Sequence, residues 1–444
     1  MNEKDTVFLI SLGCAKNLVD SEHMLGMLRT GGFEPVSNIE DAGIALINTC
    51  GFIQPAVKEA VDTILEVVDI KKNGRLNKII VAGCLVQRYG YKLRKEIPEV
   101  DGWLGTGEMH RILEVINETK QNPAPFYIGR PEYLVDHSVP RVQTTPFYTA
   151  YLRIAEGCSH KCSYCIIPGL RGPFRSRSME SLITETKEMA DRGVKEINVI
   201  AQDTTRYGSD LKEAITLEDL LEDLVAVDGL KWIRLLYCHP DMISDRLLAL
   251  MESEERICPY IDLPLQHVNK DILKAMRRNT TGESPYHLIE RIRSKRRKIS
   301  LRTTFMVGFP GETHEAFREL CEFVKAVEFD HLGAFIYSSE KGTRAALLSP
   351  EVKKDIAKRR LNKIMKLQEG IAEKLNQRMT GETLPVLIEG FSPETDLLLK
   401  GRTSAMAPDI DGQVLINKGN GIEGEIMNVL ITEAHAYDLV GELV

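Results

Sequence analysis

Apolar and polar positions follow two alternating patterns along most of the chain. Short continuous apolar runs recur, and between them lie segments in which apolar residues return every three or four positions. A short apolar run is typical of a buried strand, and the second spacing is typical of an amphipathic helix. Because parallel strands need long crossover connections that are usually helical, these repeated units predict an α/β protein with parallel sheets.

The first units predict a doubly wound parallel sheet in an α/β domain over residues 1–130. Three of its apolar runs, VFLISLGC, AGIALINTC and KIIVAGC, end at Cys14, Cys50 and Cys84. Helical sequence follows, with NLVDSEHMLGMLRTGG after the first run and PAVKEAVDTILEVVDI after the second. The carboxyl ends of neighbouring parallel strands meet at one edge of a sheet, where open sheets bind ligands. We therefore expect the three thiols to share one crevice.

A second series of units, over residues 144–375, predicts six further strands. Segments such as SMESLITETKEMADRG and THEAFRELCEFVKAV have helical periodicity, and Thr313 suits the N-cap of the second. Six units with right-handed crossovers predict a parallel sheet curled into a partial (β/α)6 barrel, with its chemistry at the carboxyl ends of the strands. The expected strands are 148–157, 197–203, 232–237, 260–266, 301–309 and 331–337.

The last part of the chain, residues 378–444, has a different pattern. Its apolar runs LPVLIEG, DLLLKG, QVLINKG and NVLITEAHAYDLVGELV are short, strand-like and separated by Gly and Pro. Such runs without helical segments between them predict a small all-β barrel. A helical segment over 353–377 leads into it.

The number of cysteines and the absence of export features argue against structural disulfides. The chain has nine cysteines in 444 residues, and its first residues lack a basic flank and an extended apolar core. No apolar run approaches the roughly 18 residues of a membrane span. These features predict a cytoplasmic protein whose clustered cysteines hold a metal or do redox chemistry. Cys238, Cys258 and Cys321 share no pattern and are expected to be packing residues.

The stretch EGCSHKCSYC places Cys158, Cys162 and Cys165 within eight positions. A structural zinc site normally has a fourth Cys or His ligand, and His160 cannot easily turn inward between two nearby ligands. Three thiolates on a four-iron, four-sulfur cube leave one iron without a protein ligand, whereas electron-carrying ferredoxins fill all four places with Cys. The spacing therefore favours an iron–sulfur cluster with an open catalytic position, and zinc stays a lesser alternative.

This spacing resembles the signature of the radical S-adenosylmethionine superfamily. The resemblance implies that S-adenosylmethionine binds the open iron, receives one electron from an external donor, and is cleaved to a 5′-deoxyadenosyl radical. It also implies a place near the adenine for Tyr164, just before the last cysteine. Polar residues and glycines at the expected strand ends are further candidates for binding this cofactor: Gln202, Asp203, Gln266 and Gly308. No catalytic residue beyond the cluster ligands is assigned.

The cysteines of the first domain admit two interpretations. A single Cys at the end of an apolar strand is usually a small buried hydrophobe. Three at equivalent positions favour a second three-thiolate cluster, since each lies beside a glycine that lets the backbone approach closely: Gly13, Gly51 and Gly83.

Two such clusters in one chain resemble the methylthiotransferase family, and the resemblance covers the whole chain. Members of this family have an N-terminal α/β domain, a radical S-adenosylmethionine barrel and a small TRAM barrel. The resemblance implies two [4Fe-4S] clusters and the use of two S-adenosylmethionine molecules, one supplying a methyl group and the other the radical. It further implies that the N-terminal cluster carries the sulfur to be transferred to an unactivated carbon.

The family has two chief branches, which differ in substrate. One modifies an adenosine of tRNA, and the other modifies the β-carbon of an aspartate on the small-subunit ribosomal protein S-twelve. The tRNA enzymes typically have Gln where Ala15 stands, and they differ over Asp203–Tyr207. Four stretches resemble the ribosomal-protein branch: GCAKNLVDSE, CGFIQPAVKEA, IPGLRGPFRSR and AQDTTRYGSDL.

Charge gives a separate argument about the partner. Residues 378–444 contain four basic and eleven acidic residues, so they hold the whole net charge of −7. A barrel that binds RNA should be basic, so direct nucleic-acid binding is not expected. Acidic stretches such as PETD (393–396) and PDID (408–411) suit a basic ribosomal protein, although such acids also serve solubility alone. The basic run RSKRRK (293–298) is expected to be a solvated face late in a barrel helix.

Three alternative functions remain open from the sequence. A tRNA adenosine 2-methylthiotransferase would share both clusters but bind tRNA in a salt-dependent way. An iron–sulfur electron-transfer protein would share the clusters but leave S-adenosylmethionine intact. A zinc-bearing RNA-binding module would lack iron and sulfide.

Overall fold

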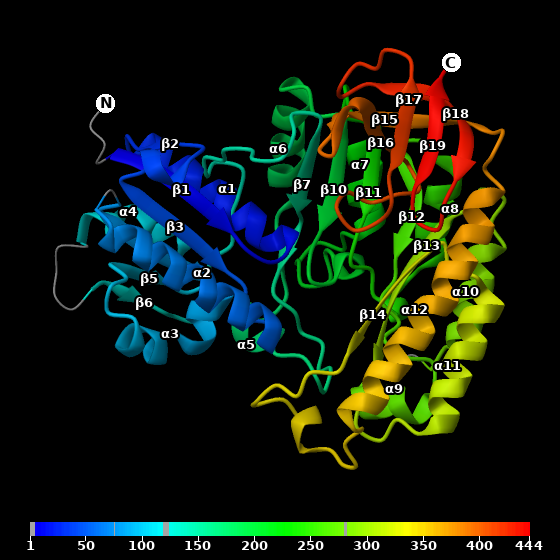
Figure 1. Cartoon of the computed structure of the whole chain (residues 1–444), viewed down its shortest axis with the longest axis horizontal. Helices are drawn as coiled ribbons and strands as arrows, with labels where there is room; N and C mark the ends of the chain where they lie inside the picture. Colours follow the sequence, from blue (N-terminus) through cyan, green and yellow to red (C-terminus); the bar gives the residue numbers. More distant parts are fainter. Residues whose placement is uncertain (1–4, 75, 119–123, 279–281) are drawn as a thin grey trace.

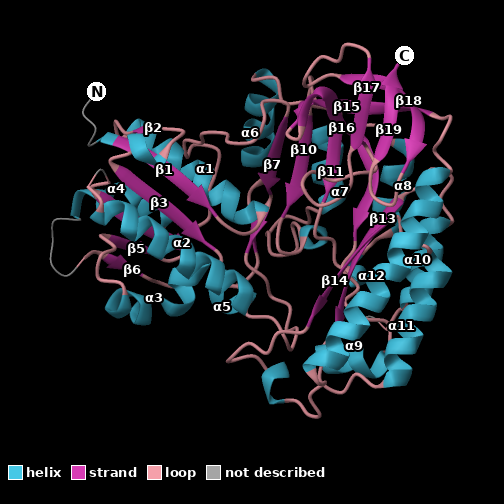
Figure 2. Ribbon diagram, in the orientation of Figure 1, coloured by secondary structure: helices cyan, strands magenta, loops and turns pink. Residues whose placement is uncertain are grey.

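Three large sheets, each built from its own stretch of chain, make up the computed structural model (Figure 1). It describes residues 5–74, 76–118, 124–278 and 282–444. The first sheet and the second are parallel, and the third is a closed barrel. Figure 2 shows helices covering the parallel sheets, whereas the C-terminal barrel is nearly all strand. The predicted fold class is confirmed.

The N-terminal sheet has the strand order β2-β1-β3-β4-β5-β6, and all its neighbours are parallel. The chain runs outward from β1 in both directions, so β1 and β3 flank the point where a doubly wound sheet opens a ligand crevice. Its strands are β1 (Thr6–Ser11), β2 (Glu34–Pro35), β3 (Ile44–Thr49), β4 (Lys78–Gly83), β5 (Gly102–Leu104) and β6 (Phe126–Tyr127). Its helices are α1 (Ala15–Thr30), α2 (Gln54–Lys72), α3 (Cys84–Glu96) and α4 (Ile112–Glu118).

The second sheet is the predicted partial barrel, in the order β14-β13-β12-β11-β10-β7. All six predicted strands are present: β7 (Thr149–Arg153), β10 (Glu196–Ile200), β11 (Trp232–Leu235), β12 (Ile257–Asp262), β13 (Ser300–Val307) and β14 (His331–Ile336). The longer helices around it are α6 (Met179–Asp191), α7 (Leu217–Val225), α8 (Asp245–Ser253), α10 (Pro285–Arg293), α11 (His314–Val327) and α12 (Lys354–Gln377). Thr313 caps α11 as predicted, because its side chain accepts the Ala316 N–H.

Helix α1 of the N-terminal domain packs against the first strands of this open barrel. Val19 of α1 packs in one apolar cluster with Tyr151, Ile200 and Leu236, which come from or directly follow neighbouring barrel strands. Helix α1 therefore belongs to two cores at once, because its other side packs on the N-terminal sheet through residues such as Met24. This shared helix fixes one domain against the other.

The C-terminal domain is a closed five-stranded barrel in the order β15-β16-β17-β19-β18. Its strands are β15 (Thr383–Ser392), β16 (Thr395–Thr403), β17 (Val414–Lys418), β18 (Ile426–Ala434) and β19 (Leu439–Leu443). It docks on the amino ends of the parallel strands, since Arg402 pairs with Glu196 at the start of β10 and Ser404 accepts from Arg234 of β11. The strands of the second sheet run away from this contact (Figure 1).

This docking corrects the prediction that PDID is an acidic surface. The side chain of Asp411 is only 2% exposed and accepts hydrogen bonds from the Tyr260 hydroxyl (2.7 Å) and the Ala407 N–H (2.9 Å). Arg302 also lies 3.3 Å from it. Asp409 is exposed, so only part of the stretch meets solvent. A buried acid with these partners is a contact between domains and cannot meet an external protein.

The basic run RSKRRK is partly solvated as predicted, but most of it lies beyond the helix. Helix α10 ends at Arg293, so the rest of the run forms the turn before β13. Arg297 donates to the carbonyls of Met251 and Glu254, at the end of α8 and just beyond it. Arg297 therefore ties one barrel unit to the next, while the side chains of Arg296 and Lys298 are 95% and 65% exposed and face solvent as predicted. Its place after the helix follows from Ser294, which caps α10 at its C-terminal end.

Cys238, Cys258 and Cys321 are buried in apolar clusters, which confirms that they are packing residues. Within the described ranges, no helix is both long enough and apolar enough to cross a membrane.

Replacing Glu196 by Ala should strongly destabilise the docked C-terminal barrel. Its carboxylate is fully buried between Arg234 and Arg402, and losing one partner of a buried pair typically costs about 3–5 kcal/mol. Burial opposes ionisation, but the two arginines outweigh it and lower the pKa of Glu196 from 4.5 to about 2. This stabilisation is therefore present above pH 4.5 and is lost as the pH falls toward 2.

Urea unfolding at neutral pH measures this cost. Glu222→Ala is the matched control, because Glu222 pairs with Arg246 on an exposed surface, where such a pair contributes about 1 kcal/mol or less. Equal effects of the two variants would show that the Glu196 pair does not hold the C-terminal barrel in place.

Candidate functional site

The loop with Cys158, Cys162 and Cys165 follows β7 at the carboxyl end of the partial barrel. It is held by a small hairpin of β8 (Ala155–Glu156) and β9 (Arg175–Ser176), and by the Cys158 N–H, which donates to the Gly172 carbonyl at 3.0 Å. The three cysteines line an open pocket of about 430 Å³. The structure therefore brings the three predicted ligands together around one accessible space.

These thiols lie where burial opposes their ionisation. Burial raises the pKa of Cys158 to about 11 and that of Cys165 to about 12. A guanidinium nitrogen of Arg278 lies 4.0 Å from the Cys162 sulfur. Metal binding requires thiolates, so a bound metal would add to Arg278 the positive charge that offsets burial of these thiols.

Asp203, a predicted cofactor residue, holds the cysteine loop. Its carboxylate lies 2.5 Å from the His160 ring and accepts the Thr205 hydroxyl at 2.6 Å, so both of its oxygens have partners. His160 also stacks on His239, with ring centroids 4.0 Å apart. His160 is thus engaged by its neighbours and not by the thiols, as expected. Asp203 orients the loop through this ring.

The other predicted cofactor residues lie around the same end of the barrel. Gln202 follows β10 and donates to Glu156 at 2.8 Å, while its amide oxygen is buried without a partner among the described residues. The amide oxygen of Gln266 is also buried, and the part of the chain that the structure describes gives it no partner. Tyr164 packs in an apolar cluster with Met276 and Phe309. The two unpartnered acceptors suit a ligand that donates hydrogen bonds, as the amino and hydroxyl groups of S-adenosylmethionine do.

Gly308 has a structural reason to be glycine. Its φ is +75°, and a Cβ there would lie 2.7 Å from the Cβ of Ala357 on α12. The residue therefore allows the turn after β13 to approach α12 closely. Its prediction as a cofactor residue stays a prediction.

The three N-terminal cysteines lie at adjacent strand ends. The glycines beside them allow the turns that carry these cysteines to pack closely. A Cβ on Gly13 would lie 2.8 Å from the Cβ of Cys50 and 3.2 Å from its sulfur. A Cβ on Gly51 would lie 2.8 Å from the carbonyl oxygen of Cys84. Each glycine thus lets one cysteine-bearing turn pack against the next.

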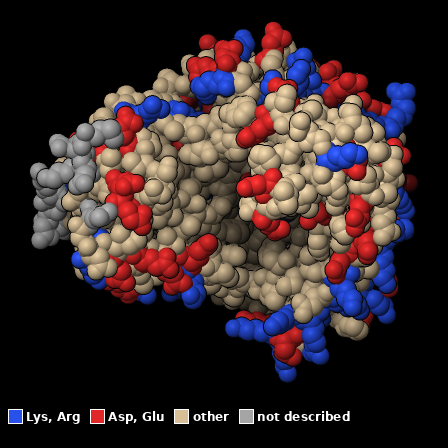
Figure 3. Space-filling view, turned by 45° about the horizontal axis from the view of Figure 1, so that its top comes forward, with Lys and Arg blue, Asp and Glu red and all other residues tan. Residues whose placement is uncertain are grey.

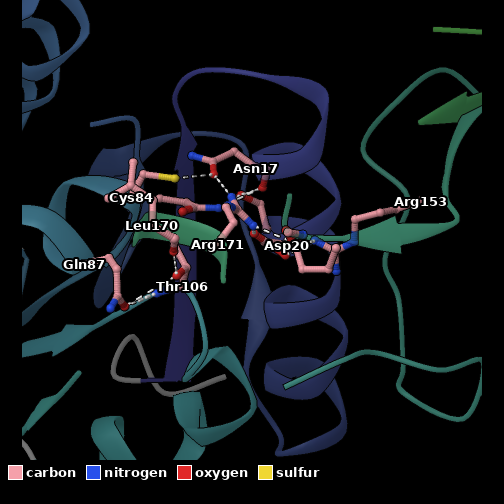
Figure 4. A network of polar contacts seen from close by, with 12 residues as sticks. Asn17, Asp20, Cys84, Gln87, Thr106, Arg153, Leu170 and Arg171 are labelled. Atoms are coloured by element: carbon pink, nitrogen blue, oxygen red, sulfur yellow. Dashed lines mark hydrogen bonds and ion pairs between the residues drawn. The ribbon is translucent and has the colours of Figure 1, made fainter. Parts of the chain in front are cut away.

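The side chain of Asn17 connects the three turns, and Figure 4 shows its contact with Cys84. Its amide nitrogen donates to the carbonyls of Leu12 and Thr49, both at 2.9 Å, which precede Cys14 and Cys50. Its amide oxygen lies 3.8 Å from the sulfur of Cys84. One buried amide therefore holds the ends of β1, β3 and β4 in register.

The same amide oxygen accepts a hydrogen bond from Arg171, which belongs to the barrel domain. Arg171 is the last residue of the short helix α5 (Ile167–Arg171), just after the cysteine loop. It is 2% exposed and also pairs with Asp20 of α1 at 2.6 Å and with Glu156 at 3.3 Å. Arg153 binds the same two carboxylates, which completes a buried network of four charges across the interface.

Burial and nearby cations act in opposite directions on the N-terminal thiols. Burial raises the pKa of Cys84 to about 12 and also raises that of Cys50. The side chain of Cys14 reaches the surface; desolvation by the surrounding protein opposes its ionisation, but Lys16 and Arg171 outweigh that effect, so the pKa of this thiol is lowered. Cys14 is the most exposed of the three and the readiest to ionise.

Neither cysteine group is arranged around a single ion. Within the described residues, no three Cys, His, Asp or Glu side chains are placed to bind one metal together. Thiolates on a cuboidal cluster bind different iron atoms, so they do not have to share one centre.

Models of three known families match successive parts of the chain. The uncharacterized protein family UPF0004 matches residues 6–105, the radical SAM superfamily residues 152–324, and the TRAM domain residues 380–444. Curated relatives match the whole length. A protein of Geotalea uraniireducens is 49% identical over 99% of both chains, and one of Geobacter sulfurreducens is 48% identical over 100% of this chain and 99% of its own. Both are described as ribosomal protein uS12 methylthiotransferase RimO.

The chain belongs to the ribosomal protein uS12 methylthiotransferase family.

Solved structures support the fold of this family member but are distant in sequence. The radical S-adenosylmethionine methyltransferase TsrM from Kitasatospora setae aligns with a TM-score of 0.58 at 14% identity, covering 86% of this chain and 80% of that one. The cobalamin-dependent radical enzyme OxsB aligns at 0.51 and 15% identity, covering 83% and 56%. At these sequence identities, the alignments show a shared fold and nothing about function.

Sequence reasoning did not find the polar residues that join the two cysteine groups of this methylthiotransferase. Asn17 and Asp20 lie in a helix where they could equally face solvent. Arg153 carried a signal, because it is a charge at the end of a strand that is otherwise buried and apolar. Only the packing of α1 on the barrel shows that it meets Asp20.

Proposed function

We propose that this protein transfers a methylthio group to the β-carbon of an aspartate of ribosomal protein uS12. It would use two [4Fe-4S] clusters and two S-adenosylmethionine molecules, with electrons from an external donor. The observation that carries this proposal is the presence of two three-cysteine groups, one on each side of a single domain interface. The names of the full-length relatives support the substrate. A ribosomal substrate implies that the reaction takes place in the cytoplasm.

The barrel cysteines suit the radical half of this reaction. Cys158, Cys162 and Cys165 would hold a cluster that, when loaded, supplies the electron that cleaves S-adenosylmethionine. Gln202 and Gln266 would orient that cofactor through their unpartnered amide oxygens. Asp203 keeps the loop in place through His160.

The N-terminal cysteines suit the sulfur-carrying half. Cys14, Cys50 and Cys84 would hold the second cluster, while Asn17 fixes the spacing of their turns. A space-filling view shows the molecule hollowed between the N-terminal domain and the rest, with few charged side chains inside the hollow (Figure 3). An opening of this kind gives a protein loop a route to the interface.

An assay with reconstituted enzyme under anaerobic, reducing conditions tests the substrate. Purified uS12 and unmodified tRNA are offered in parallel, and mass spectrometry follows each. We expect a methylthio group on an aspartate of uS12 and none on tRNA. Modification of tRNA alone would overturn the substrate assignment.

The exposed acids of the TRAM barrel should help to bind the basic substrate protein. Glu394, Asp396 and Asp409 are exposed, whereas Asp411 has to be left intact because it is buried. Reversing these three to Lys should weaken binding of uS12 and reduce its dependence on salt, because exposed charges steer and select partners. Titration calorimetry or surface binding at two salt concentrations measures both effects.

A matched control reverses three exposed acids on the outer helix α12. Asp355, Glu369 and Glu373 give the same change in net charge at a different place. We expect this control to retain more affinity than the TRAM variant. Equal losses would show that only the net charge matters and that the TRAM surface has no special part in binding.

A further inference from the structure

We propose that Arg171 is a positioning residue of the N-terminal cysteine site, supplied by the barrel domain to hold the site in place and balance its negative charge. This inference rests on the proposed function in one respect, namely that Cys14, Cys50 and Cys84 bind a cluster. It adds that the N-terminal site is incomplete until the barrel domain has docked.

The first support is the shared contact on Asn17. The amide oxygen of Asn17 accepts from Arg171 and lies 3.8 Å from the sulfur of Cys84. Its amide nitrogen meanwhile holds the turns of Cys14 and Cys50. By fixing the orientation of this amide, the guanidinium of Arg171 acts on all three cysteine turns through a single side chain.

The second support is the charge balance of the interface. Asp20 and Glu156 are 4% and 6% exposed, and Arg153 and Arg171 are each 2% exposed. Two buried acids and two buried arginines cancel before any thiolate forms. A thiolate-bound cluster adds negative charge beside them, and without Arg171 both carboxylates would face Arg153 alone. A buried excess of negative charge is costly, so the guanidinium has an electrostatic part as well as a structural one.

The third support is the place of α5 between the two cysteine groups. At its start, the Ile167 N–H points to the sulfur of Cys165 at 3.5 Å. At its end, Arg171 reaches Asn17, and the Thr106 hydroxyl donates to the Leu170 carbonyl. Five helical residues advance roughly 6 Å from first to last. One rigid segment therefore contacts both groups and sets their separation.

The experiment isolates the N-terminal site in the full-length chain. Replacing Cys158, Cys162 and Cys165 by Ala leaves iron only at the N-terminal site. Arg171→Gln and Arg171→Lys are made in this background. Arg141→Gln is the matched control, because Arg141 joins Glu22 of α1 to Glu185 of α6 across the same interface without contacting the cysteine turns. The midpoint potential of the remaining cluster and its loss to a chelator are measured.

We expect Arg171→Gln to shift the potential to more negative values and to speed cluster loss, because a removed positive charge disfavours the reduced cluster. Arg171→Lys should keep the potential near that of the background while still losing cluster faster, since it keeps the charge but not the forked hydrogen bonds. Arg141→Gln should leave the potential unchanged.

Two results would overturn the inference. One is an unchanged potential and unchanged cluster loss in Arg171→Gln. The other is an equal shift in Arg141→Gln, which would show a general loosening of the interface. If the chain with the three barrel cysteines replaced binds no iron, the cluster assignment in the proposed function is wrong. This failure is distinguishable from failure of the Arg171 inference, because it occurs before any arginine is changed.

Discussion

Cys162→Ala should abolish reductive cleavage of S-adenosylmethionine while the N-terminal site still binds iron. The three cysteines of the barrel loop line one pocket, and each would bind a different iron of one cluster. Losing one removes a ligand that no neighbour replaces, because His160 is engaged by Asp203. Release of 5′-deoxyadenosine under reducing conditions, followed by chromatography, should fall to the background level.

Iron content serves as the internal control for this variant. About half of the parental iron should remain, as expected when one of two cuboidal clusters is lost. Release of 5′-deoxyadenosine at the parental rate would refute the radical role of the loop.

Cys50→Ala should separate radical formation from sulfur transfer. The variant loses the central ligand of the N-terminal group, so iron should again fall by about half. The barrel site is intact, so 5′-deoxyadenosine should still form. Methylthiolation of uS12 should fall below detection, because the site that carries the sulfur is gone.

Cys321→Ala is the matched control for Cys50→Ala. Cys321 is a buried free cysteine in the barrel core, away from both cysteine groups. It should keep full iron and activity. Normal iron content and normal methylthiolation in Cys50→Ala would instead reduce the N-terminal cysteines to core packing.

The two parallel sheets could be predicted because their signals are local. The central strands are apolar runs that the pattern marks, and each of Cys14, Cys50 and Cys84 stands at the end of one, whereas the exposed strand β2 gives no such signal. The glycine beside each cysteine is a further local signal, because a glycine at such a position predicts a close backbone approach. The structure shows that approach at Gly13, where a Cβ would lie 2.8 Å from the Cβ of Cys50. The domain limits at 1–130, 144–375 and 378–444 stay predictions.

The contacts between domains could not be predicted, because they depend on which polar residues become buried when domains dock. Asp409 and Asp411 lie two positions apart, yet the first is exposed and the second is bound by Tyr260 and Arg302. Asn17 is one polar residue among several in α1. Nothing in the sequence of either domain alone distinguishes such residues from ordinary surface positions.

The position of Arg171 has a consequence for the order of events during synthesis of the chain. Arg171 lies 87 positions after Cys84, and ribosomes add about 5–20 residues per second, so roughly 4–17 s separate the making of the last N-terminal thiol from that of its partner arginine. Strands β5 and β6 of the N-terminal sheet are made within this interval, but the thiols still lack the guanidinium that orients Asn17. The chain therefore completes its N-terminal site only after the first strand of the barrel and helix α5 have been made, so a fragment that ends with the N-terminal sheet would lack this contact.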